Sequence, residues 1–215
     1  MWGPTMWSGL FFGLISLFTP QASLPDTQAL QGELQQFAQY FQIDAQRVKF
    51  RDSLLKNPSP FLTYGGSKAC VVHINHNDDA KRVWSHFVNA GAEGASQAFL
   101  AFSSGHELTH CMLAEPGRRA SARQALEQQL GVMFSSNTQF EETLADLVGL
   151  AYVAKVMPEQ YAAVLDRLRD IRQDFSASDP EHNSSNSLRG DHVAFAEQLV
   201  ARSAAKGLQV AQAQP

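Results

Sequence analysis

Seven residues in the middle of the chain, from Gly105 to Cys111, read GHELTHC. On a helix, His106 and His110 lie one turn apart on the same face, so both imidazoles can reach one metal ion. Two neutral imidazoles and a carboxylate are a common ligand set for a catalytic zinc ion, which lowers the pKa of water to roughly 7. Glu107 lies beside that face, where it can take a proton from the water. The pattern predicts a zinc-dependent hydrolase with Glu107 as general base.

The third metal ligand is expected later in the chain. A third histidine six residues after the second, as in one large class of zinc proteases, is excluded because Pro116 occupies that position. Glu142 and Asp146 lie four residues apart on a predicted helix and therefore share one face. Gly149 extends that face and would let this helix approach another helix closely. Glu142 is the predicted ligand, and Asp146 is predicted to accept the outer N–H of a ligating histidine. Glu141 is the alternative ligand, and the competing interpretation of these carboxylates is an exposed acidic face.

The HExxH pattern that starts at His106, followed by ExxxD starting at Glu142, resembles the gluzincin superfamily of zinc metallopeptidases, thermolysin-like in the broad sense. The resemblance implies a zincin-like domain in which two antiparallel helices cross the metal and the edge strand of a small sheet holds the peptide substrate. By the same resemblance, residues 69–75 are the candidate edge strand. The resemblance also implies a late residue that stabilises the oxyanion, for which His182 is the first choice and Arg189 the second.

Apolar periodicity and helix-breaking residues predict a mostly helical α+β chain around these motifs. The β-branched run at 69–75 is expected to form a strand, and 47–53 a short alternating strand. Helices are expected over residues 26–41, from 77 to the loop at 90–96, and over 97–115, 138–157, 158–175 and 191–204. Two of these helices carry the two motifs.

The N-terminus differs sharply in composition from the rest of the chain. The first 25 residues contain no charged side chain, and residues 7–18 are apolar apart from Gly and Ser. Small residues follow at Ala22 and Ser23, which is the layout of a secretory signal peptide. The alternatives are an uncleaved membrane anchor, although a spanning helix needs about 20 apolar residues, and a buried helix. We expect residues 1–22 to be a signal peptide and 23–215 a single exported domain, periplasmic or secreted, that meets a membrane only if the leader is kept.

The composition excludes several other classes of protein. A net charge of -4 with 18% charged residues argues against a nucleic-acid partner, since such proteins usually carry a basic patch. Two cysteines are too few for an all-cysteine zinc site. In an exported protein, Cys70 and Cys111 can form a disulfide between the predicted strand and the histidine-bearing helix, and otherwise they are two buried thiols.

These observations predict a zinc-dependent metallopeptidase that hydrolyses peptide or protein substrates through a metal-activated water. One alternative is an exported, non-catalytic helical binding protein that keeps a structural or vestigial zinc site. Another is a zinc hydrolase that acts on a different kind of substrate. The presence of Glu107 favours an enzyme, because a purely structural site has no use for a base at that position. No sequence pattern defines a specificity pocket or an oligomeric state.

Overall fold

The computed structural model describes residues 23–41, 44–66, 69–88, 94–115, 117–174, 176 and 180–212. The predicted signal peptide, residues 1–22, lies outside these ranges. Among the helices so described, none is long and apolar enough to cross a membrane. The helices are α1 (Thr27–Phe41), α2 (Asp78–Val88), α3 (Ala95–Leu113), α4 (Arg118–Leu130), α5 (Asn137–Val156), α6 (Tyr161–Asp174) and α7 (Gly190–Gln212). The strands are β1 (Val48–Ser53), β2 (Phe61–Gly65) and β3 (Cys70–Asn75), and the 3-10 turns are η1 (Ala45–Arg47), η2 (Pro180–His182) and η3 (Ser185–Ser187).

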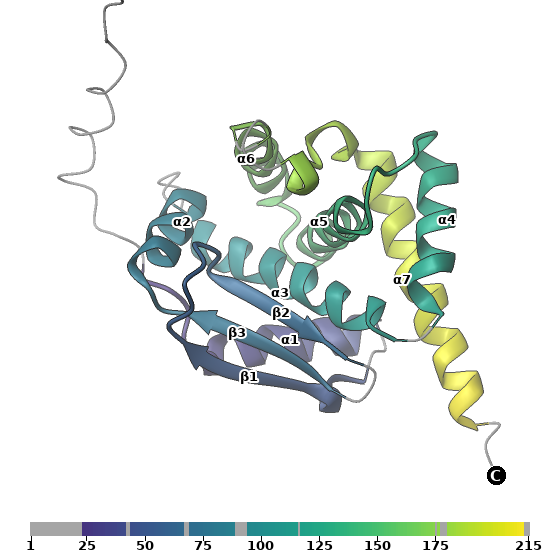
Figure 1. Ribbon diagram of the computed structural model, residues 1–215, viewed down its shortest axis with the longest axis horizontal. Helices are drawn as coiled ribbons and strands as arrows, with labels where there is room; N and C mark the ends of the chain where they lie inside the picture. The colour runs from purple at the N-terminus through teal and green to yellow at the C-terminus, as the bar shows by residue number, and fades with distance from the viewer. Residues whose placement is uncertain are drawn as a thin grey trace, which may run out of the picture.

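The architecture is α+β and mostly helical with a small three-stranded sheet, as the sequence predicts (Figure 1). Two elements lie outside that prediction, for different reasons. Helix α4 has no continuous apolar stripe in its sequence, and it buries only Ala122 and Leu126. Strand β2 is five residues long and lies between Pro60 and Gly66, which read as breakers.

The central strand of the sheet is β3, in the order β1-β3-β2. Strand β1 pairs with β3 in parallel, and β2 pairs with it antiparallel. The prediction that residues 69–75 form the edge strand is therefore wrong. The physical reason is that β3 is an apolar run with Cys70, Val72 and Ile74 buried, which suits a strand with neighbours on both sides. The edge that borders the predicted catalytic helix is β2.

Helix α3 lies between the sheet and helix α5 (Figure 1). It contacts β2 and α1 on one side and α5 on the other, while α7 packs against both α5 and α4. The core is continuous across these layers. For example, Phe37 of α1 packs edge-to-face on Tyr152 of α5, with ring centroids 5.0 Å apart, and both residues are fully buried.

Helices α3 and α5 approach each other most tightly at a pair of glycines. A Cβ atom placed on Gly105 would lie 2.9 Å from Cα of Gly149, and one placed on Gly149 would lie 2.7 Å from the carbonyl oxygen of Phe102. Side chains of any size are excluded at such distances. The close approach predicted at Gly149 is thus confirmed, and it brings the histidine-bearing turn of α3 against Glu142 and Asp146.

A disulfide joins Cys70 at the start of β3 to Cys111 on α3. The two residues are 41 positions apart in the sequence, and both are buried. The bond therefore ties the central strand of the sheet to the helix that carries the two histidines.

Candidate metal centre

The turn of α3 between His106 and His110 faces α5. The Nε2 atoms of the two histidines are 3.2 Å apart. One carboxylate oxygen of Glu142 lies 3.5 Å from Nε2 of His106, and the other lies 3.4 Å from Nε2 of His110. The structure therefore brings the three predicted ligands together in a cluster that could hold a metal ion.

The spacing of these donor atoms fits a zinc ion. Zinc in proteins is usually tetrahedral with bonds of about 2.0–2.1 Å, which places neighbouring donor atoms about 3.3–3.4 Å apart. The two imidazole nitrogens are 3.2 Å apart, and each lies within 3.5 Å of a different carboxylate oxygen of Glu142, which is close to that value. Two imidazole nitrogens and one carboxylate also match the preference of zinc, and three protein donors leave a fourth position for water or substrate.

The charges around the histidines favour a divalent cation. Glu107 and Asp146 are buried, and Glu142 is nearly so. Arg172 contacts two of these three carboxylates, Asp146 at 2.7 Å and Glu142 at 3.5 Å. These three carboxylates outnumber the one guanidinium, so the cluster is acidic. Because buried charge is costly unless it is compensated, a dication would stabilise the cluster.

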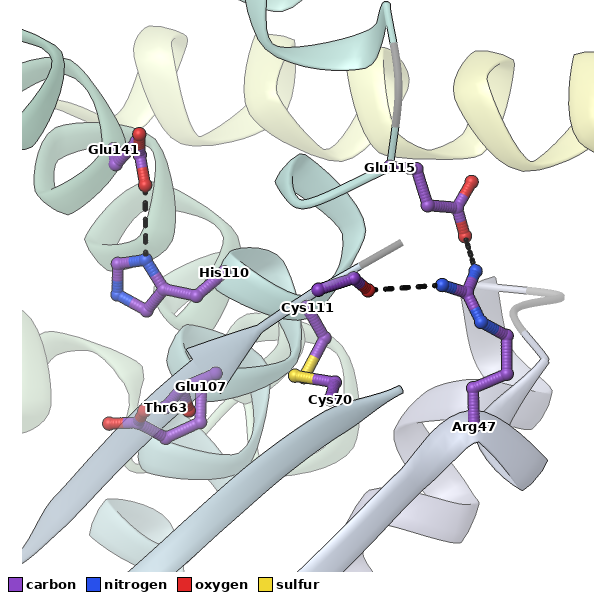
Figure 2. The surroundings of a disulfide bond; sticks show 9 residues. Arg47, Thr63, Cys70, Glu107, His110, Cys111, Glu115 and Glu141 are labelled. Atoms are coloured by element: carbon purple, nitrogen blue, oxygen red, sulfur yellow. Dashed lines mark hydrogen bonds and ion pairs between the residues drawn. A yellow bond between two sulfur atoms is a disulfide. The ribbon is translucent and has the colours of Figure 1, made fainter. Parts of the chain in front are cut away.

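The outer nitrogens of both histidines face carboxylates. Nδ1 of His106 lies 2.9 Å from Asp146, the position predicted for that residue. Nδ1 of His110 lies 4.0 Å from Glu141 (Figure 2). Glu141 also forms a 2.8 Å ion pair with Arg119. Glu141, the alternative ligand, is thus on the outer side of His110 and outside the three-donor cluster. Carboxylates in such places orient ligating histidines and fix which nitrogen carries the proton.

Asp146 is a fully buried hub of hydrogen bonds from three parts of the chain. Besides the bond with His106, it accepts two from Arg172 of α6, both 2.7 Å, and one from the hydroxyl of Ser184. Sequence reasoning missed Arg172 and Ser184. Their partner is 26 and 38 residues away, so no local spacing could mark them.

Glu107 points from α3 toward the sheet and is 7% exposed. The hydroxyl of Thr63 on β2 donates a hydrogen bond to one of its carboxylate oxygens (Figure 2). Burial raises the pKa of Glu107, an effect opposed by the nearby His106 and by this hydrogen bond. Sequence reasoning also missed Thr63, because the strand that carries it was not predicted.

The two histidines differ strongly in proton affinity. Burial disfavours a charge on His106, but its hydrogen bond with Asp146 and the negative charge of Glu142 outweigh this effect and raise its pKa to about 9. Burial and the neighbouring His106 lower the pKa of His110 to about 4. Asp146 is also buried, yet the charge of Arg172 and the hydrogen bond with His106 hold its pKa well below the usual range.

The late residues predicted to stabilise an oxyanion separate in the structure. His182 lines the same cleft as the metal cluster, and its Nε2 lies 3.6 Å from Glu142. Arg189 is absent from the cleft lining and lies 3.5 Å from Asp191 on the surface. His192, near the start of α7, is buried, and its ring faces the carbonyl oxygen of Ser187 at 2.8 Å.

A cleft of about 620 Å³ is lined by the three candidate ligands together with Glu107 and His182. Its lining includes the segment 57–60 with the first residues of β2, and residues from α5 and α6. Apolar side chains in the lining include Val83 and Phe87 of α2, Phe102 of α3 and Ile171 of α6.

No protein-family model, curated protein or solved structure matches this chain.

Proposed function

We propose that the protein is a zinc-dependent metallopeptidase with a zincin-like arrangement of helices and sheet. The observation that carries the proposal is the turn of α3 that presents His106 and His110 to Glu142, with Glu107 buried beside them. Structural zinc sites usually have four protein ligands, whereas catalytic sites have three and an open position. A three-donor cluster that lines a cleft supports the catalytic alternative.

Several side chains have defined roles in this proposal. A zinc ion held by the three donors would acidify water and polarise a carbonyl group. Glu107 takes the proton from the water and returns it to the leaving amine. Its raised pKa suits a group that must both accept and release a proton, and Thr63 fixes the orientation of its carboxylate. Asp146 holds the proton of His106 on Nδ1, which leaves Nε2 available as a donor.

His182 is the best candidate for stabilising negative charge on the oxyanion. It is the only one of the two predicted residues that lines the cleft beside Glu142. A histidine N–H placed there can donate a hydrogen bond to oxygen in the transition state. Arg189, paired with Asp191 at the surface, is not assigned a role.

The open edge of β2 is the proposed place for the peptide backbone of the substrate. Asn75 donates to the carbonyl of Pro60, and Gly66 donates to the carbonyl of Ala69. In this antiparallel register, the backbone groups of Phe61 and Thr63 point away from β3. No described strand pairs with that edge, which borders the cleft. An extended peptide could add there as a further strand, beside Glu107 and the metal cluster.

Replacing Glu107 with Gln tests this function. The change keeps the size of the side chain and removes the base, so we expect peptide hydrolysis to fall by roughly 10²- to 10⁴-fold. Hydrolysis would be followed on unstructured casein peptides by mass spectrometry, with bound zinc measured on the same samples. The matched control is Glu159→Gln, the same change at an exposed residue outside the cleft.

If Glu107→Gln binds zinc and hydrolyses peptides as fast as the wild type, Glu107 is not the base. If the wild type binds zinc but cleaves no peptide, the alternative of a binding protein with a vestigial site is favoured. The disulfide supports the further proposal that the protein is exported, because such bonds persist mainly in oxidising compartments.

A further inference from the structure

Helix α3 presents two adjacent rows of side chains to two different neighbours. His106 and His110 face α5. Glu107, Cys111 and Ala114 follow one another at spacings of four and three residues, which places them on one face of the helix, and this face is turned toward the sheet. The turn that carries the metal ligands is therefore also the turn that is attached to the sheet.

Each residue of the sheet-facing row contacts a strand, and Figure 2 shows the strand partners of Glu107 and Cys111. Thr63 on β2 donates a hydrogen bond to Glu107, and Cys70 on β3 forms the disulfide with Cys111. Gly65 on β2 packs so closely against Ala114 that a Cβ atom placed on the glycine would lie 2.5 Å from Cβ of Ala114. Among these contacts the disulfide is the covalent one, and its cysteine on α3, Cys111, directly follows His110 in the sequence.

Small rotations of α3 would move the ligand atoms by distances that matter for metal binding. Side-chain atoms lie about 5–6 Å from the axis of a helix, so a rotation of about 10° moves them by about 1 Å. Metal–ligand distances in proteins are held to within about 0.2 Å. A bond from the same turn to a central strand restricts both this rotation and sliding along the helix axis.

We infer that the Cys70–Cys111 disulfide is a positioning crosslink for the metal centre, which increases metal affinity without contacting the metal. The inference rests on the metal cluster of the proposed function. Both cysteines are buried, 3% and 8% exposed, so the crosslink acts as a permanent part of the site rather than as a readily reduced switch.

The first test removes the crosslink. In the variant Cys70→Ala/Cys111→Ala, the dissociation constant for zinc, measured by competition with a chelator, is expected to rise about tenfold. The absorption spectrum of bound Co²⁺ is expected to change, because it reports the ligand geometry. The control is Leu126→Ala, which removes a fully buried side chain of α4 outside the cleft. This control is also destabilised, but it should bind zinc and Co²⁺ as the wild type does.

The second test uses the wild-type chain and does not depend on the folding of a variant. Coupling between two sites is reciprocal, so if the disulfide tightens zinc binding tenfold, zinc must stabilise the disulfide by the same factor. A tenfold change corresponds to about 30 mV for a two-electron couple. The reduction potential, measured in a monothiol redox buffer at fixed free zinc, should therefore become more negative by about 30 mV when zinc is added. Glu142→Gln should abolish this shift.

The outcomes distinguish this inference from the proposed peptidase. Zinc affinity within twofold of wild type in the double variant, or a potential that does not respond to zinc, would overturn the positioning role. That result would leave the peptidase intact if hydrolysis persists. Conversely, a zinc-dependent potential in a protein that cleaves no peptide would support the crosslink and overturn the peptidase. A wild type that binds no zinc would overturn both.

Discussion

Zinc and protons compete for the same two imidazole nitrogens at the metal cluster. With a pKa of about 9 for His106 and about 4 for His110, the metal-free cluster holds one proton between those limits. A metal needs the lone pair on Nε2 of both histidines, so binding must displace that proton. Protons therefore favour the metal-free protein. We expect zinc affinity to rise about tenfold per pH unit up to about pH 9 and then to level off.

This pH dependence can be measured by calorimetric titration of the metal-free protein with zinc at pH 7. Buffers with different ionisation enthalpies give the number of protons released per zinc, and the expected value is close to one. Release of no proton would mean that both histidines are already neutral at pH 7, contrary to the effect assigned to Asp146. Glu141→Gln is a suitable control, because Glu141 does not contact His106.

At the scale of elements, the site depends on the crossing of α3 and α5. In Gly149→Ala, the new Cβ would lie 2.7 Å from a backbone oxygen of α3 and must push the helices apart. We expect this variant to lose about 1–3 kcal/mol of unfolding free energy, as overpacked sites do, and to bind zinc more weakly. Urea denaturation and zinc competition would measure the two effects.

Gly32→Ala on α1 is the matched control for this prediction. It is the same substitution within a helix, but no atom lies within 4 Å of the added Cβ. Here the higher helix propensity of alanine should stabilise the protein by about 0.5–1 kcal/mol. Shifts of the same sign in both variants would contradict the role given to the crossing.

The elements that could be predicted from the sequence are those with a local signal. Apolar periodicity indicated α1 and α6, and the HExxH pattern placed its histidines on the right helix. The order of the strands could not be predicted, because it is set by pairing between distant segments. For the same reason β3 was assigned to an edge that β2 occupies.

The candidate site also contains residues that could be predicted from the sequence and residues that could not. His106, Glu107, His110, Glu142 and Asp146 lie in two local patterns whose spacing follows from the chemistry. The residues that hold them, Thr63, Arg172 and Ser184, act through contacts between distant parts of the sequence, and such contacts leave no periodicity.

At the scale of the whole molecule, the described residues next to the predicted cleavage site contact the rest of the domain. Trp84 donates a hydrogen bond to the carbonyl of Ser23, and Leu24 packs against the core. If residues 1–22 are a signal peptide, the mature protein recovered from an exporting host should begin near Ser23. Its intact mass measures this directly. A mass that includes Met1, found in the membrane fraction, would instead identify the segment as an anchor.

The central claim is that His106, His110 and Glu142 form one zinc site. The most direct measurement is the zinc bound per chain after equilibration at buffered free zinc, compared among the wild type, Glu142→Gln and Glu141→Gln. We predict one zinc per wild-type chain, affinity weakened by at least about 100-fold in Glu142→Gln, and a smaller loss of about tenfold in Glu141→Gln, which loses only an orienting carboxylate. A wild type without zinc, or a Glu141→Gln variant that loses zinc while Glu142→Gln retains it, would contradict the assignment.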